Sequence, residues 1–501
     1  MSRQRVIVAA VLVVGALFVG HAGPWISQGF GYSLDGFNGA VWGQGARAAV
    51  DDPIASRLGG IQPDGHRYAN HPPLTVWSGA VLSAVSGDSP VAVRLPAVLA
   101  SLLALAALAL LLHDAGAAPG AVVVGVVAAG TCSMFLTYGA MLDTPVVSFP
   151  FALLALAAAQ RGWQGRPPPT GLTVGAAALA CVSGWQAALL TGIVVAVSLV
   201  AHRRTAARLL VGMGLGTAVS VSWIAWVHGS LRPLLDQATY RTSAGGTQAP
   251  WLTAQQRHLG DLYGPVLLVL VAVGLVVALL PRPAATADPA TEPGRDDAAI
   301  EPGAPTWAGP LLTGMRPLVL VLVASVAGYT ALFRNGSAIH DYWTFWGVAL
   351  VAVGAAALAD RLIGVAAGRA LPSTLVTAAT AVVVVALAAS GLTRPSDAEQ
   401  RVRDGVDLIA VIEEAPNAAD PTATAIAVYD QPGTLPWADY AVDGLAVHAD
   451  DVDDLRALPP DLPVLVVLGG PASPALQSRA IAVNDRFALV PAAALADHLS
   501  R

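Results

Sequence analysis

The sequence predicts a mainly α-helical membrane protein that crosses the bilayer about eleven times and ends in a small α/β domain. Its 501 residues are 55% hydrophobic and only 12% charged, whereas about a quarter of the residues in a soluble domain are charged. The apolar residues form long uncharged runs, such as 95–112 and 115–142, and a helix of about 20 apolar residues spans a bilayer. This composition excludes a plain cytosolic enzyme.

Each predicted span is an apolar run between polar or turn residues. The first covers residues 6–20 behind Arg3 and Arg5, and we interpret it as a retained helix with a cytoplasmic N-terminus. Residues 74–86 are apolar but too short to cross, so we expect a helix lying in the interface. The other ten spans are expected over 91–112, 119–139, 145–160, 170–184, 186–201, 205–227, 264–281, 317–333, 342–359 and 374–392.

The positions of arginine set the expected topology, because short cytoplasmic loops are rich in basic residues. With eleven spans, Arg-containing connections such as 161–166 and 203–208 are cytoplasmic. Two large polar loops, 22–90 and 228–263, are then extracytoplasmic. Residues 283–315 are rich in Pro, Ala, Thr, Asp and Gly, a composition that predicts a disordered cytoplasmic loop.

The C-terminal residues 395–501 differ from the transmembrane domain expected over 1–394. They hold 17 acidic side chains and six Arg, a net charge of −11, which leaves +5 for the rest of the chain. Their pattern predicts an extracytoplasmic α/β domain. We expect no nucleic-acid partner for so acidic an exposed domain, because affinity for nucleic acid comes mainly from neutralising phosphates. We expect strands near 425–429, 441–447 and 464–468, and helices near 398–414, 452–457 and 473–482.

Ionisable side chains are nearly absent from the middle of the predicted spans and gather at outer helix ends and in the two outer loops. Transporters and proton pumps usually carry such residues near the middle of the membrane. The pattern therefore favours a reaction or binding site at the outer membrane face.

Five short segments on this outer side resemble a known family. They read GYSLDGFN at 31–38, YANHPPL at 68–74, AVRLP at 92–96, MLD at 141–143 and HDY at 340–342. In kind and order they are similar to segments of the GT-C glycosyltransferases that use polyprenyl-phosphate sugars, the group that contains protein O-mannosyltransferases and lipid A aminoarabinose transferases. All 27 basic residues are Arg, which suggests a high-GC bacterial genome and hence a bacterial plasma membrane.

The resemblance implies an inverting enzyme that moves a sugar from a polyprenyl-phosphate donor to an extracytoplasmic lipid, glycan or protein acceptor. Many family members carry Asp-Glu where this chain has Asp35-Gly36. Because the second carboxylate is missing, we expect a metal-independent transfer without a cofactor. A divalent cation stays an alternative, with Asp143 as a carboxylate that would help to hold it.

Two carboxylates are the catalytic candidates. The resemblance implies that Asp35 is the general base on the acceptor hydroxyl, and its structural alternative is a cap on a helix that starts at Phe37. Asp143 precedes Thr144-Pro145, a sequence typical of a helix N-terminus. Asp143 is therefore either a second catalytic carboxylate or only a cap.

Basic and polar residues at the outer face are candidates for substrate binding. Arg241 and Arg257 would pair with the donor phosphate, because a guanidinium matches phosphate oxygens; each is otherwise an arginine that faces lipid headgroups. His340 would reach the same phosphate, and the resemblance places Asp341 and Tyr342 beside it. His71 would shape the loop that Pro72 and Pro73 stiffen.

Two other functions remain open from the sequence. A lipid-linked glycan transporter or flippase would use the outer charges as an entrance, although the uncharged span centres argue against transport. A non-catalytic cell-envelope assembly protein would use its acidic C-terminal domain to bind a partner.

Overall fold

The structure is a computed structural model of the whole chain, and it describes most of residues 3–280, residues 314–368 and several stretches after 378. Within the first range, residues 31–33, 64, 167 and 244–250 are not described. The longest later stretches are 446–468 and 472–500. The expected cytoplasmic loop over 283–315 and the eleventh span over 374–392 lie almost entirely outside the described residues.

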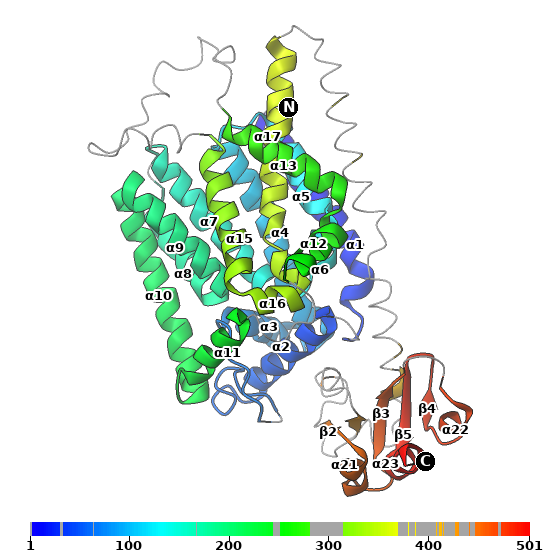
Figure 1. Cartoon of the computed structure of the whole chain (residues 1–501). Helices are drawn as coiled ribbons and strands as arrows, with labels where there is room; N and C mark the ends of the chain where they lie inside the picture. The colour runs from blue at the N-terminus through cyan, green and yellow to red at the C-terminus, as the bar shows by residue number, and fades with distance from the viewer. Residues whose placement is uncertain are drawn as a thin grey trace.

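Helices dominate the described chain and form one bundle (Figure 1). The first half contains α1 (Arg3–Ile26), α2 (Leu34–Asp51), α3 (Leu74–Ser86), α4 (Pro90–Asp114), α5 (Pro119–Thr131), α6 (Ser133–Tyr138), α7 (Thr144–Trp163), α8 (Thr170–Ser183) and α9 (Trp185–Ala201). The second half contains α10 (Arg203–His228), α11 (Arg232–Thr242), α12 (Trp251–Tyr263), α13 (Pro265–Leu279), α15 (Arg316–Leu332), α16 (Arg334–Ile339), the 3-10 helix η2 (Asp341–Thr344) and α17 (Gly347–Gly368).

Ten of the eleven predicted spans lie on these helices, so the structure confirms a polytopic helical membrane protein. By length and hydropathy, five helices of the described residues can cross a membrane: α1, α4, α7, α10 and the segment Asp341–Ala366. The pair α12 and α13 would make a sixth, bent by 99° at Gly264, whose positive φ of 78° suits glycine. The other predicted spans among the described residues are apolar helices of 10–17 residues.

The bundle is held by close approach of small residues as well as by apolar side chains. α13 packs on α17 where Gly274 meets Gly354, and a Cβ atom at Gly274 would lie 2.5 Å from the Gly354 carbonyl carbon. Small residues allow such backbone contact between membrane helices, where van der Waals packing drives association.

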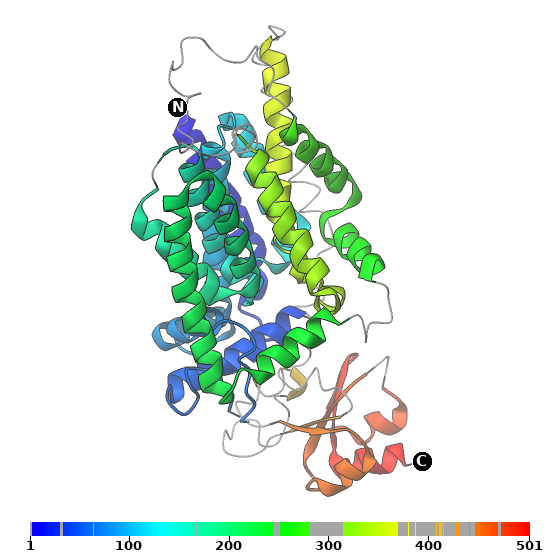
Figure 2. The ribbon, with the colours of Figure 1, turned by 60° about the vertical axis from the view of Figure 1, so that its left-hand side comes forward.

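One end of the bundle, opposite the N-terminus, carries a layer of shorter helices. Figures 1 and 2 show α2, α3 and α11 at this end, next to the C-terminal domain. The expected helix over 74–86 is confirmed as α3. Both large loops of the sequence analysis thus contain helices, and these helices meet at the same end of the bundle.

The C-terminal domain is built around a five-stranded sheet in the order β2-β1-β3-β5-β4. β1 pairs in parallel with β2 and β3, while β5 pairs antiparallel with β3 and β4. The described elements are β1 (Ala427–Tyr429), β2 (Val447–Ala449), α21 (Val452–Ala457), β3 (Pro463–Val467), α22 (Pro474–Gln477), β4 (Ala482–Val483), β5 (Phe487–Pro491) and α23 (Ala492–Leu499).

Several C-terminal predictions are confirmed and others need correction. The strands near 425–429 and 464–468 and the helix near 452–457 exist. Of the strand expected over 441–447, residues 441–445 lie outside the described residues, and the described strand is Val447–Ala449. The helix near 473–482 ends at Gln477. β5 and α23 were not predicted. One apolar run covers both, so the change from the strand period of two residues to the helical period is not visible in the sequence.

Alternation along the strands gives the sheet two buried faces. Ala427, Val464 and Ala488 face a cluster with α21 and α23. Their neighbours Val428, Leu465 and Phe487 join a second cluster, which also contains Trp42 of α2 and Trp223 of α10. One apolar layer therefore connects the C-terminal sheet with the helices at this end of the bundle.

The glycine contact between α13 and α17 can be tested by adding a side chain. We expect Gly274→Val to lower the free energy of unfolding by about 1–3 kcal/mol, because overpacking forces the two helices apart. Gly192→Val on α9 is the matched control, since nothing lies within 4 Å of a Cβ atom there. Thermal unfolding in detergent measures both, and equal unfolding temperatures for the two variants would contradict the close contact.

Candidate active site

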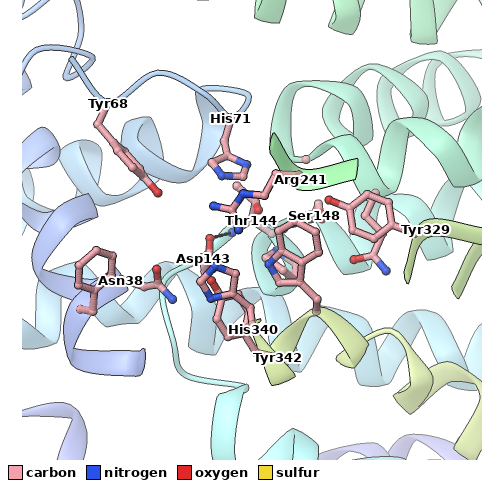
Figure 3. A pocket seen from close by; sticks show the side chains of 15 residues that line it. Asn38, Tyr68, His71, Asp143, Thr144, Ser148, Arg241, Tyr329, His340 and Tyr342 are labelled. Carbon is pink, nitrogen blue, oxygen red and sulfur yellow. Dashed lines mark hydrogen bonds between the residues drawn. The ribbon is translucent and has the colours of Figure 1, made fainter. Parts of the chain in front are cut away.

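A small pocket lies where the shorter helices cover the end of the bundle. Its walls come from α2, the segment before α3, the start of α7, α9, α11, α15 and η2. It is lined by Phe37, Asn38, Tyr68, His71, Asp143, Thr144, Pro145, Ser148, Gly184, Gln186, Arg241, Tyr329, His340, Tyr342 and Trp343. Figure 3 shows Arg241 and His71 on one side of Asp143, with His340 and Tyr342 on the other.

Asp143 is the buried carboxylate of the pocket. It caps α7, and its Oδ1 accepts a hydrogen bond from the Thr144 amide at 2.6 Å and one from Trp42 Nε1 at 3.3 Å. Burial raises the pKa of Asp143 to about 6, although these bonds, a hydrogen bond from Tyr342 and the charge of Arg241 act in the opposite direction. A carboxylate whose pKa lies near the working pH is suited to accept and release a proton.

α2 holds the partner of this carboxylate. Asn38 and Trp42 are four residues apart and so lie on one face of the helix; Asn38 lines the pocket while Trp42 binds Asp143. Both are buried, with 4% and 2% of their surface exposed. The rotation of α2 about its axis therefore decides whether Asp143 keeps its indole donor.

Arg241 brings a guanidinium to the same pocket from the last turn of α11. Its charged group lies 5.1 Å from the ring centroid of Trp343. With the Gln237 amide in its hydrogen-bonding orientation, the amide oxygen accepts from Nε at 2.9 Å and from Nη2 at 3.1 Å. The remaining Nη1 is buried and has no partner among the described residues, so it is available to an anionic ligand.

The two histidines of the pocket are neutral near pH 7. Burial and the positive charge of Arg241 lower the pKa of His71 to about 3 and the pKa of His340 to about 3. The ring of His340 stacks on Trp343 at a centroid distance of 5.8 Å. These imidazoles therefore offer hydrogen bonds without adding charge.

Several polar atoms of the pocket lack partners among the described residues. They are Nη1 of Arg241, Nδ1 of His340, and both amide atoms of Gln186. Buried polar groups in native proteins are almost always hydrogen bonded. Donors and acceptors from three separate elements are therefore available around one cavity to a polar ligand or to ordered water.

The residues of the pocket do not fit a metal ion held by the protein alone. In the part of the chain that the structure describes, no three His, Cys, Asp or Glu side chains come together as a candidate metal site. Asp143 is the one carboxylate among the lining residues, and it faces a guanidinium.

Five of the eight candidates named from the sequence line the pocket, and three lie elsewhere. Those in the pocket are Asp143, His71, Arg241, His340 and Tyr342. Arg257 is exposed on α12. The carboxylate of Asp341 accepts a hydrogen bond from the Tyr138 hydroxyl at 2.7 Å and does not line the pocket.

Asp35 is also buried, but its carboxylate pairs with Arg94 and does not face the pocket. Its Oδ2 lies 3.1 Å from Nη2 of Arg94, and both side chains are almost fully buried. α2 begins at Leu34, so Asp35 lies in the first turn and does not cap a helix starting at Phe37. Arg94 also donates to the carbonyl groups of Ile26 and Gln28. The pair thus joins the ends of α1, α2 and α4, outside the pocket lining.

Some residues that line the pocket were not among the site candidates named from the sequence. Tyr68 stands three residues before His71 in the YANHPPL segment, and Trp343 follows the HDY segment, so their neighbours gave a signal. Tyr329 and Gln186 lie within predicted spans, where nothing local distinguishes them from residues that face other helices. Burial raises the pKa of Tyr68 well above its usual value, so its hydroxyl stays protonated.

The pair of Asp35 and Arg94 makes a stability prediction. Arg94→Met leaves a buried carboxylate without its counterion, and we expect a loss of about 3–5 kcal/mol in the free energy of unfolding. Arg232→Met is the control, because its ion pair with Asp236 is exposed and such pairs contribute about 0–1 kcal/mol. Denaturant or thermal unfolding in detergent compares them; an Arg94→Met protein as stable as the control would disprove the structural role of the pair.

No family model and no curated protein matches this sequence. Solved structures do match. ArnT from Cupriavidus metallidurans bound to undecaprenyl phosphate has a TM-score of 0.57 and 15% identity, over 97% of this chain and 97% of that chain. The archaeal oligosaccharyltransferase AglB from Archaeoglobus fulgidus, in complex with an inhibitory peptide and a dolichol-phosphate, has a TM-score of 0.56 and 12% identity, over 93% of this chain and 69% of that chain.

At these identities the comparison concerns the fold. It confirms the fold that the outer segments of the sequence suggested: the chain has the GT-C fold of membrane glycosyltransferases.

Proposed function

We propose that this protein is an inverting glycosyltransferase that moves one sugar from a polyprenyl-phosphate carrier to an extracytoplasmic acceptor. The observation that carries the proposal is the placement of Asp143 and Arg241 in one buried pocket. Glycosyl transfer to a hydroxyl group needs a base for the acceptor proton and positive charge for the departing phosphate. The pocket offers one group of each kind.

Asp143 is the better candidate for the base than Asp35. Asp143 lines the pocket and has a pKa raised to about 6 by burial. Asp35 is neutralised by Arg94 outside the pocket lining. The catalytic part that the family resemblance implied for Asp35 is therefore assigned to Asp143, and Asp35 becomes a residue that positions α2.

The reaction needs only groups of this chain. The acceptor oxygen attacks the anomeric carbon and its proton passes to Asp143, while the bond between that carbon and the phosphate oxygen breaks. Attack from the side opposite the phosphate inverts the anomeric configuration. The polyprenyl phosphate leaves with its extra negative charge facing Arg241, and Asp143 later releases the proton to water.

The charge of the pocket fits a donor with a single phosphate. Arg241 is the only cationic side chain among the described lining residues, because His71 and His340 are neutral. A sugar linked to a monophosphate carries one negative charge, which one guanidinium can pair with. The neutral imidazoles and the Gln186 amide would bind sugar hydroxyls or the other phosphate oxygens.

A second cavity supports a lipid carrier. An apolar groove of about 970 Å³ runs between α12, α13, α15 and α17. Thr330 and Thr344 line this groove. Thr330 directly follows Tyr329 in the sequence and Thr344 directly follows Trp343, and both of these neighbours line the pocket. An isoprenoid tail in this groove would keep its phosphate at the depth of Arg241.

The solved structures with this fold support the same chemistry. ArnT was crystallised with undecaprenyl phosphate, and AglB with a dolichol-phosphate. We propose that the present chain uses a donor of this class, with its pocket on the extracytoplasmic side of a bacterial plasma membrane and its N-terminus in the cytoplasm. The acceptor would be a lipid, glycan or protein of the cell envelope. Mass spectrometry of lipid-linked sugars and envelope glycans, in cells with and without the protein, identifies donor and acceptor.

Replacing the proposed base gives the first functional prediction. We expect Asp143→Asn to lower kcat by about 10²–10⁴-fold, as is usual for loss of a general base. Donor binding should persist, because Arg241 and the groove are unchanged. The control is Asp236→Asn, because the carboxylate of Asp236 is exposed on α11 and outside the pocket, and this variant should retain most activity. Full transfer by Asp143→Asn, or equal losses in both variants, would contradict the assignment.

The pH dependence of the intact enzyme follows from the same group. The pKa of Asp143 is raised to about 6, so its basic form dominates above this pH. We expect kcat/KM to be constant above about pH 7 and to fall about tenfold per unit below pH 6. A profile that stays flat down to pH 4.5 would exclude a base of this pKa.

Arg241 and Arg257 provide a matched pair for the phosphate. Arg241→Gln should weaken undecaprenyl phosphate binding by about 10–100-fold, because a charged hydrogen bond contributes about 1.5–3 kcal/mol. Arg257→Gln should leave affinity unchanged, since Arg257 is exposed away from the pocket. Binding measurements in detergent test both variants. An equal loss of affinity in the two would contradict the assignment of Arg241 as the phosphate-binding residue.

A further inference from the structure

α2 carries two neighbouring rows of residues with different partners. Asn38 and Trp42 form the row that faces the pocket and Asp143. Gly39 and Gly43, each one residue further along the chain, form a row without side chains. The ring of Phe30 lies against Gly39, and a Cβ atom at Gly43 would come within 2.7 Å of the Tyr440 ring. The glycine row thus forms a seat for two aromatic rings.

Tyr440 reaches this seat from the C-terminal domain. Only 8% of its surface is exposed. Its ring packs edge-on against Phe30 at a centroid distance of 4.7 Å, and the Arg47 guanidinium lies 4.5 Å from the ring centroid. Its hydroxyl donates to Asp88 at 3.3 Å, and Asp88 in turn binds Nε of Arg47 at 2.6 Å. The ring is therefore enclosed by Phe30 before α2, Arg47 on α2 and Asp88 between α3 and α4.

The same aromatic seat is tied to the buried ion pair. The guanidinium of Arg94 lies 4.3 Å from the ring centroid of Phe30 while it pairs with Asp35 in the first turn of α2. The start of α2 is therefore fixed by Arg94, and its middle by Tyr440. These contacts act together with the packing of α2 on α3 to hold the rotation of the helix about its axis.

We propose that Tyr440 is a positioning residue for the active site: seated on Gly43, it holds α2 in the rotation that directs Trp42 at Asp143. The consequence for the reaction rests on the proposed function, in which Asp143 is the base. The C-terminal domain is then a structural part of the catalytic pocket, although the described part of that domain contributes no lining residue.

The proposal predicts a change in the ionisation of Asp143. The Trp42 indole bonds to the charged carboxylate, which lowers the pKa of Asp143. Tyr440→Ala should let α2 rotate and lose this bond. The titration midpoint of the Asp143 carboxyl group, called the midpoint below, should then move upward from about 6 by about one unit. The titratable groups that face Asp143 lie on other elements and stay in place: Tyr68, His71, Arg241, His340 and Tyr342. Asn38 lies on α2 and would move with Trp42.

Infrared difference spectra of the full-length protein measure this midpoint without any substrate. Subtracting the spectrum of Asp143→Asn isolates the carboxyl band of Asp143 as pH is varied. We expect the upward shift in Tyr440→Ala, together with a fall in kcat of up to about tenfold near pH 6 and an unchanged donor KM. Tyr440→Phe keeps the ring on Gly43 and should retain the midpoint of the intact protein.

Tyr429→Ala is the matched control within the same domain. Tyr429 packs on the opposite face of the sheet, so its loss weakens the domain without touching α2 and should leave the midpoint in place. An unshifted midpoint in Tyr440→Ala, or an equal shift in Tyr429→Ala, would overturn the positioning role. If Asp143→Asn transfers sugar normally, the proposed function fails instead, while the infrared shift still decides the role of Tyr440.

Gly43→Ala changes the α2 side of the contact between Gly43 and the Tyr440 ring. It tests the proposal even if Tyr440→Ala does not fold. The added methyl group would displace the Tyr440 ring, so the midpoint should rise as in Tyr440→Ala. In the double variant the shifts should not add, because the clash disappears with the ring. Additive shifts would show that the two residues act separately and would count against the proposal.

Discussion

A carboxylate and a guanidinium buried in one pocket at the end of an apolar bundle set the main physical constraint on this molecule. Removing a charge from water is costly unless the protein supplies hydrogen bonds and an opposite charge. Asp143 receives an amide from its own helix end, an indole from α2 and the field of Arg241. Three elements distant in sequence, α7, α2 and α11, thus meet at this carboxylate and favour its ionised form.

The sequence predicted the helical membrane fold and much of the pocket, because both depend on strong local signals. Long uncharged runs define spans whatever their neighbours, and the MLD and HDY segments pointed to Asp143, His340 and Tyr342. What the sequence could not show was that Asp35 pairs with Arg94 outside the pocket lining, whereas Asp143 lines the pocket. Both carboxylates are buried, and the difference lies in Arg94, which stands 59 residues from Asp35 and pairs with it only in the folded chain.

The errors in the C-terminal domain have a related cause. β5 and α23 follow each other within one apolar stretch, where a period of two changes to a helical period with no breaker except Pro491. Pairing of β5 with β3 and β4 selects the strand, and such long-range pairing leaves no mark in the local sequence. The glycines of α2 show the same limit, since Gly39 and Gly43 are understood only when Phe30 and Tyr440 are seen against them.

The 99° bend between α12 and α13 at Gly264 has a consequence for substrate traffic. Both halves of the bent pair line the apolar groove, so the groove belongs to the lateral wall of the bundle. A carrier of the proposed kind would arrive and depart by diffusion within the plane of the bilayer, and its chain would never pass through water. Turnover would then depend on the surface density of loaded carrier in the membrane, so the same enzyme would work faster in a membrane richer in that lipid.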